Sequence, residues 1–326
     1  MVAWARTGKG GSGMRIEGME AIAQRNGRTT TLPRYERSRE EWSPEPAIAC
    51  STCLPLSEVE AAIAASPLSD GSRALVRGLL RLGTARVFAG GGIGIEYGSL
   101  LKTAARPEYI GGHVKEVAAH LRARRVDLLL VPGMSGYPVG AMYSVVSGIP
   151  AVLLKKARLD DDGQQTYPAG AFVIPSYTGE GDVVMHADPP AVQDIVDGIV
   201  ARQLAEQMEA ERVLMILRAA GADDIIDKAT MSRAVGESAV VLGEAAIDDF
   251  VRRHRAATGD RRPIERRVEI VAWVTPLIKG YNRPHEHLRR TFGIEPFAGV
   301  NVTSVHLQPP AIGVEGVGMV PFGWEG

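Results

Sequence analysis

Residues 126–140, with the sequence VDLLLVPGMSGYPVG, have the residue types and spacing to bind an anion. An apolar run leads into a loop rich in glycine, and a helix is predicted to start near Pro138. Backbone N–H groups at such a helix start are free and favour a negative charge. Gly133 and Gly136 lack the Cβ atoms that keep an anion from the backbone, and Ser135 adds a hydroxyl donor. The alternative interpretation is a tight strand-to-helix turn, which favours the same residues.

Other motifs give weaker indications. The segment 90–98 (GGGIGIEYG) lacks the G-x-G-x-x-G spacing, so we do not expect dinucleotide binding. His285 and His287 have no identifiable third ligand, which favours a surface pair and leaves no predicted metal site. Cys50 and Cys53 could form a redox pair, half a zinc site or a disulfide, but we favour two small apolar side chains.

The elements that must position these residues alternate as in an α/β protein. VDLLLVP has no polar alternation, which indicates a strand buried on both faces of a parallel sheet. We expect helices at 56–65, 72–82, 111–125, 138–146, 189–221 and about 237–256. Strands are expected from residue 85 and at 126–132, 148–156, 266–274 and 299–307.

Composition narrows the class of protein. The chain has 326 residues, 45% of them hydrophobic and 23% charged, which is typical of globular proteins. The net charge of -1 argues against nucleic acid as the main partner, and the arginine-rich segment 252–267 is interpreted as a solvated or interface face. No apolar run approaches the roughly 20 residues of a membrane helix. The N-terminal sequence lacks the apolar core of a secretory signal, so we expect a cytoplasmic protein.

Four segments, in order along the chain, resemble motifs of the type I phosphoribosyltransferases, most closely of the adenine phosphoribosyltransferase branch. They are 99–110 (SLLKTAARPEYI), 126–140, 147–159 (SGIPAVLLKKARL) and 176–188 (SYTGEGDVVMHAD). The resemblance implies an open, mostly parallel sheet of this family's kind with flanking helices, followed here by an α+β C-terminal extension. We therefore predict an N-terminal extension at 1–70, partly flexible, a phosphoribosyltransferase-like core at 71–205 and a C-terminal helical region with a few strands at 206–326.

The resemblance also implies a reaction. Phosphoribose passes from phosphoribosyl diphosphate to a purine-like or other nitrogen heterocycle, with Mg²⁺ carried by the diphosphate donor and diphosphate released. We expect a homodimer, and the partners that the resemblance implies are small-molecule substrates, phosphoribosyl diphosphate and a heterocyclic base. The residues implied for diphosphate binding are Gly133, Met134, Ser135, Gly136 and Tyr137. Those implied for catalysis are Lys155, Lys156, Tyr177, His186 and Asp188, and Phe88 is the candidate for stacking on the base. Segment 159–182 is expected to form a flap that excludes water.

Two departures from the family pattern bear on this implied function. Ser135 stands where the family has an arginine, and the Thr-Gly-Gly-Thr loop that cradles the 5′-phosphate is missing. The family's acid pair has one candidate in Asp223 and Asp224, with Thr230 following, which would bind the ribose phosphate. The alternatives are that 183–194 is the signature strand, or that 222–231 is a solvated helix-to-strand connection.

Three functions fit these observations. The leading hypothesis is a divergent phosphoribosyltransferase. The missing loop also fits a non-catalytic, regulatory binder of a nucleotide or phosphosugar on the same fold. It fits equally a glycosyl-transfer enzyme whose donor lacks a 5′-phosphate.

Overall fold

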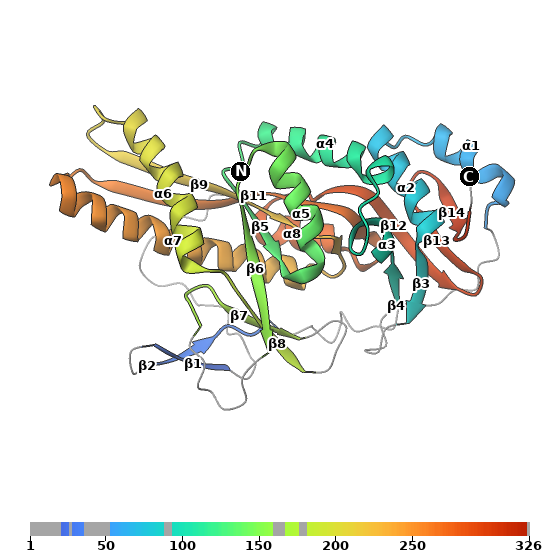
Figure 1. Cartoon of the computed structure of the whole chain (residues 1–326), viewed down its shortest axis with the longest axis horizontal. Coiled ribbons are helices and arrows are strands. Elements are labelled where there is room, and N and C mark those ends of the chain that lie inside the picture. Colours follow the sequence, from blue (N-terminus) through green and yellow to red (C-terminus); the bar gives the residue numbers. More distant parts are fainter. Residues whose placement is uncertain are drawn as a thin grey trace.

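One ten-stranded sheet runs along the long axis of the molecule (Figure 1). The computed structural model of the chain describes residues 21–25, 28–35, 53–87, 93–158, 167–175 and 181–324. The strands of the sheet are, in spatial order, β14 (Gly318–Pro321), β13 (Pro310–Val314), β12 (Phe297–Leu307), β11 (Ile264–Lys279), β9 (Val213–Ala222), β5 (Leu128–Pro132), β6 (Ala151–Arg158), β8 (Asp182–His186) and β7 (Phe172–Pro175). The short strand β10 (Ile225–Ile226) pairs with β11 beside β9.

The centre of this sheet is parallel and its two ends are antiparallel. β12, β11, β9, β5 and β6 pair in parallel, whereas β13 and β14 at one end and β8 and β7 at the other are antiparallel. The predicted open, mostly parallel sheet with flanking helices is confirmed.

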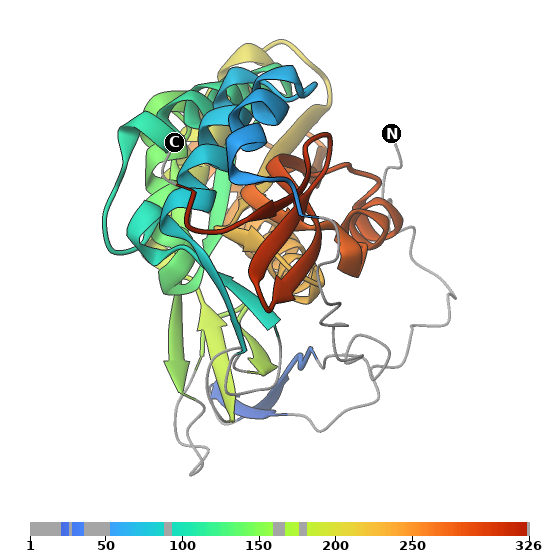
Figure 2. The ribbon, with the colours of Figure 1, turned by 90° about the vertical axis from the view of Figure 1, so that its right-hand side faces the viewer.

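Helices cover both faces of the sheet, which separates two hydrophobic cores (Figure 2). On one face lie α1 (Leu56–Ala65), α2 (Asp70–Leu82), α3 (Gly98–Leu101), α4 (Pro107–Ala123) and α5 (Gly133–Ser147). On the other lie α6 (Pro189–Glu206), α7 (Thr230–Thr258) and α8 (Pro284–Phe292). In β5, Leu129 and Val131 face the first core while Leu128 and Leu130 face the second, as its continuous apolar run predicts.

Smaller elements complete the described part of the chain. β1 (Ala21–Arg25) pairs with β2 (Arg28–Leu32), and β3 (Thr84–Val87) pairs with β4 (Ile93–Glu96), both antiparallel. A 3₁₀ turn, η2 (Gly280–Asn282), follows β11. In the ranges that the structure describes, no helix has both the length and the apolar character needed to cross a membrane.

Two predicted elements differ from those observed. The helix expected at 189–221 ends at Glu206, and its second half contains strand β9. The segment VLMILRAAGA is buried along most of its length, and such a run has no periodicity that separates a strand from a buried helix. The helix expected from Pro138 begins earlier, at Gly133. The proline therefore lies inside α5 and not in its first turn.

Residues 33–35 tie the β7–β8 hairpin to α7. The Tyr35 N–H donates to the Val173 carbonyl, and the Val173 N–H donates to the Pro33 carbonyl, both at 2.9 Å. The Tyr35 hydroxyl donates to Glu237 of α7 at 2.5 Å, and Arg34 forms an ion pair with Asp182. The segment therefore protects the outer edge of β7.

The sheet crosses the predicted division of the chain near residue 205. β9 pairs with β5 on one side and with β11 on the other. The three-part division stays a prediction. The interpretation of the CxxC motif as two small apolar side chains is wrong for Cys53, which is disulfide-bonded. The other cysteine of the sequence, Cys50, lies outside the described residues.

Candidate functional site

The carboxyl ends of β5 and β9 lie side by side, because the two strands are parallel neighbours. α5 follows β5 directly, and Asp223 and Asp224 follow β9. A Cβ atom at Gly136 would stand 3.1 Å from Asp223 Oδ1. The structure therefore brings the predicted diphosphate-binding segment and the predicted acid pair together, although 87 positions separate Gly136 from Asp223 in the numbering.

The segment 133–137 is the first turn of α5 rather than a loop. Gly133 has a φ of 44°, a left-handed conformation that glycine adopts without strain. The first N–H groups of a helix have no partner inside it, so those of this turn can still bind an anion. Met134 and Ser135 are exposed, whereas the Tyr137 hydroxyl donates to the Leu154 carbonyl at 2.6 Å and fixes α5 to β6.

Asp224 is held by two side chains from the segment around α3. Its Oδ2 atom accepts a hydrogen bond from the Tyr97 hydroxyl at 2.9 Å and lies 2.7 Å from Lys102 Nζ. The Asp224 N–H donates to Asp223 Oδ1 at 2.9 Å. Asp223 and Asp224 are 8% and 2% exposed. We call Tyr97, Lys102, Asp223 and Asp224 the acid cluster.

Burial and charge separate the two carboxyl groups of the acid cluster. Burial, followed by the charge of Asp224, raises the pKa of Asp223 well above its usual range. Burial alone would raise the pKa of Asp224 too, but the charge of Lys102 and hydrogen bonds to the carboxylate hold it below its usual value. Burial also raises the pKa of Tyr97, which is a neutral donor. The pKa values of the two carboxyl groups are therefore shifted in opposite directions, and Asp224 is the carboxylate that pairs with a lysine.

The chain between the acid cluster and α7 is not the solvated helix-to-strand connection weighed as an alternative. Gly221 lies inside β9, with the Trp273 ring 2.2 Å from the position of a Cβ, so it does not end a helix. Further along, Asp227 accepts from Lys279 Nζ at 3.1 Å and also from the Asn282 amide. Thr230 begins α7. No glycine occurs at 222–230, so the backbone here has no position without a Cβ.

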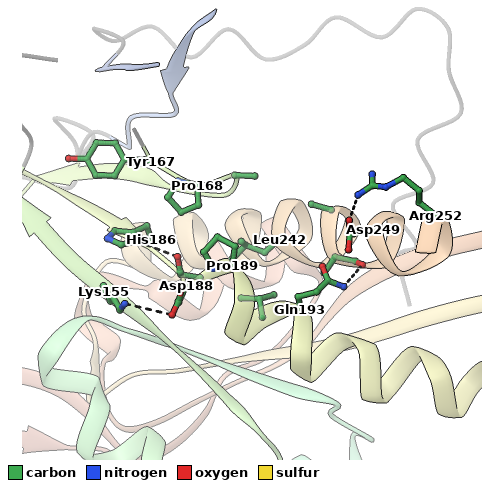
Figure 3. A pocket seen from close by; sticks show the side chains of 15 residues that line it. Lys155, Tyr167, Pro168, His186, Asp188, Pro189, Gln193, Leu242, Asp249 and Arg252 are labelled. Carbon is green, nitrogen blue, oxygen red and sulfur yellow. Dashed lines mark hydrogen bonds and ion pairs between the residues drawn. The ribbon is translucent and has the colours of Figure 1, made fainter. Parts of the chain in front are cut away.

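A pocket of about 690 Å³ opens between the β8 end, α6 and α7 (Figure 3). Three of the predicted catalytic residues, Lys155, His186 and Asp188, line it. Lys155 and His186 are paired across β6 and β8, and Lys155 Nζ lies 3.9 Å from Asp188 Oδ2. We call this cavity the α6–α7 pocket.

The other residues that line the α6–α7 pocket were not predicted as site residues from the sequence. Gln193 of α6 donates to the Ala246 carbonyl of α7 at 3.0 Å and joins the two helices. Arg252 pairs with Asp249, and both line the pocket, although Arg252 belongs to the segment interpreted as a solvated or interface face. The pocket thus combines acidic and basic groups with an apolar wall that includes Leu242.

One predicted catalytic residue, Lys156, is not brought into these groups, and two other predicted residues are not described. Lys156 pairs in register with Met185 and does not line the α6–α7 pocket, since neighbours on a strand point to opposite faces. Tyr177 and Phe88 lie outside the described residues, as does part of the predicted flap. Within the described part of the chain, no group of three or more His, Cys, Asp or Glu side chains could hold a metal ion.

In fold, the chain is similar to solved structures of adenine phosphoribosyltransferases. The Giardia lamblia enzyme, complexed with 9-deazaadenine, is 13% identical over 71% of this chain and 97% of that chain, with a TM-score of 0.42. The Saccharomyces cerevisiae enzyme is 11% identical over 70% of this chain and 98% of that chain, with a TM-score of 0.41. The Thermoanaerobacter pseudethanolicus enzyme is 13% identical over 68% of this chain and 97% of that chain, with a TM-score of 0.40.

No protein-family model matches the sequence, and no curated protein matches it. These solved structures are of adenine phosphoribosyltransferases, the branch that the four sequence segments resemble.

Proposed function

We propose that the chain is a divergent phosphoribosyltransferase that transfers phosphoribose from phosphoribosyl diphosphate to a ring nitrogen of a purine-like or other heterocyclic base. The observation that carries the proposal is the juxtaposition of the α5 start with the acid pair at the carboxyl ends of two adjacent parallel strands. In open α/β sheets this edge is where ligands bind. The Oδ1 atom of Asp223 lies 3.1 Å from the position that a Cβ at Gly136 would take, so the first turn of α5 lies beside this carboxyl group.

The reaction explains the residue types. The bond between the anomeric carbon and the diphosphate oxygen breaks, and its electron pair leaves with the diphosphate. The ring nitrogen of the base forms the new bond to that carbon, and its proton passes to the departing diphosphate or to water. The N–H groups in the first turn of α5 would stabilise the charge that develops on the diphosphate. Asp223 and Asp224 are the candidates in this chain for the family's acid pair, which holds the ribose hydroxyls.

The metal that the resemblance implies does not fit the acid pair of this chain. Asp224 already accepts from Tyr97 and Lys102, and only 3% of its side chain is exposed. Mg²⁺ is bound through carboxylate oxygens, and here the Lys102 ammonium group already lies 2.7 Å from Asp224 Oδ2. We therefore assign no step to a metal bound at these carboxyl groups.

The proposal is tested with phosphoribosyl diphosphate, first by calorimetric titration and then by diphosphate release with a panel of bases. We expect binding and release in the wild-type protein. Gly136→Ala places a methyl group between α5 and Asp223, so binding should weaken by about tenfold while the fold is kept. Gly198→Ala is the matched control, because nothing lies within 4 Å of its Cβ position in α6. A folded protein that neither binds the donor nor releases diphosphate would contradict the proposal.

One observation favours the second candidate, a non-catalytic binder. The connection from β9 to α7 offers no glycine for close approach of a 5′-phosphate, and Asp224 is already neutralised. Binding of phosphoribosyl diphosphate without diphosphate release for any base would identify this function. Turnover of an unphosphorylated nucleoside, without a response to the phosphorylated donor, would instead identify an enzyme whose donor lacks the phosphate.

A further inference from the structure

Lys102 and Tyr97 stand at the two ends of the four-residue helix α3, and both reach Asp224. Tyr97 is the residue before the helix and Lys102 the residue after it. The Lys102 N–H of the backbone donates to the Gly98 carbonyl at 2.8 Å, which closes the turn. Lys102 Nζ also lies 5.1 Å from the centroid of the Tyr97 ring, within the range of a cation–π contact. The short helix thus fixes a phenol and an ammonium group on the same carboxylate.

Lys102 is the cation that compensates the charge of Asp224. The Asp224 side chain is 3% exposed, so its charge is unfavourable without a counter-ion. Its other close partners are the neutral Tyr97 hydroxyl and Asp223, which is itself acidic. The Lys102 side chain is 31% exposed and connects the buried carboxylate with the surface. Removal of the ammonium group would therefore leave a buried negative charge that another cation could neutralise.

We infer that the Lys102 ammonium group takes the place of a divalent cation at Asp224, so that the acid pair binds a hydroxyl-bearing sugar phosphate without a metal ion of its own. Three observations support this inference: the 2.7 Å ion pair, the burial of the carboxylate and the hydrogen bond from Tyr97 on the same oxygen. The sugar-phosphate part rests on the proposed function. The exclusion of a metal ion by Lys102 does not rest on the proposed function.

The test uses Mn²⁺ alone as the probe, measured by calorimetry and by the electron paramagnetic resonance signal of the free ion. The wild-type protein and Lys102→Arg, which keeps the charge, should bind no Mn²⁺ at the acid cluster. Lys102→Met should gain one site, at least about tenfold tighter than any residual binding to the wild type. The double variant Lys102→Met/Asp224→Asn should lose that site. Tyr97→Phe, which removes a hydrogen bond but keeps the lysine, should gain none.

Stability gives a second readout. The melting temperature of Lys102→Met should be lower than that of the wild type and should rise with Mn²⁺, whereas the double variant should not respond to the ion. If Lys102→Met does not fold without metal, refolding in the presence of Mn²⁺ supports the inference. If Mn²⁺ fails to restore folding, Lys102→Gln provides the binding test instead.

Two results would overturn the inference. One is a Mn²⁺ site in the wild-type protein that Asp224→Asn abolishes. The other is a folded Lys102→Met or Lys102→Gln protein that binds no more Mn²⁺ than the wild type. Since no phosphoribosyl diphosphate is present, these outcomes are independent of the proposed function, which fails separately if the donor does not bind.

Discussion

His113 of α4 is a buried, neutral histidine that faces α5 and β12. It is 0% exposed, and its Nε2 atom lies 2.9 Å from the Tyr143 hydroxyl. The ring stacks at 6.1 Å on that of Phe297. Burial lowers the pKa of His113 to about 4. The folded protein therefore resists a protonation that the unfolded chain accepts readily.

This difference predicts a pH dependence of stability. Above pH 6.5 the histidine is neutral in both states and the stability is complete. As the pH falls from 6.5 towards 4, the unfolded chain binds a proton that the folded protein does not, so stability decreases. Below about pH 4 both states are protonated and the loss levels off. Between pH 7.5 and 5.0 we expect this group to lower the free energy of unfolding by about 2 kcal/mol.

Urea unfolding of the wild type and of His113→Gln at the two pH values measures this contribution. The variant lacks the titrating ring, so the difference between the two proteins should shrink at pH 5.0 by the predicted amount. An equal pH dependence in both would show that the histidine is protonated in the folded state.

At the residue scale, the sequence predicted some members of the site but not their partners. The order of the four resembling segments placed Asp223 and Asp224 after the predicted core, and the structure puts Asp223 beside Gly136. Tyr97 had no local signal, because its role depends on Asp224, which lies 127 positions further along the chain. Lys102 lay within a resembling segment, SLLKT, but only the folded chain shows which charge it meets.

At the element scale, α5 packs closely on β5 because Gly140 has no side chain. A Cβ at this position would lie 2.5 Å from a Val131 methyl group, closer than real contacts allow. We expect Gly140→Ala to lower the free energy of unfolding by about 1–3 kcal/mol through overpacking. Gly198→Ala, in open space on α6, should instead raise it by up to about 1 kcal/mol through helix propensity.

Denaturant unfolding of both alanine variants measures this contrast. The wild-type protein is the common reference, and each substitution adds the same methyl group to a helix. If Gly140→Ala were as stable as Gly198→Ala, the close packing of α5 on β5 would be wrong.

Elements with a distinctive pattern could be predicted, whereas β9 could not. The buried strand at VDLLLVP stands between clear helical segments, and α4 has apolar residues at helical spacing. The β9 segment contains Leu, Met and Ala, which favour helices, and follows α6 after a short polar stretch. Its pairing with β5 and β11 overrides that preference, and such pairing is not visible in one local window.

At the scale of the whole molecule, the central strands come from both sides of the boundary predicted near residue 205. A chain that ends there would lack β9, β11 and β12, and β5 would become an edge strand with apolar side chains on both faces. We expect such a truncated chain to be insoluble or to lack a cooperative thermal transition, in contrast to the full chain. Circular dichroism melting of both proteins makes the comparison. Cooperative folding of the 1–205 fragment would instead support the predicted division.

The first helices of the chain complete their packing on its last strands. The Leu54 N–H, just before α1, donates to the Met319 carbonyl of β14 at 2.9 Å, and the Gly323 N–H donates to the Leu80 carbonyl of α2 at 2.9 Å. During synthesis α2 therefore leaves the ribosome long before its partner does. At about 5–20 residues per second, the interval is roughly ten to fifty seconds. For that time the apolar face of α2 has no final contact with residues 318–324, and a chaperone that shields it should increase the yield of folded protein.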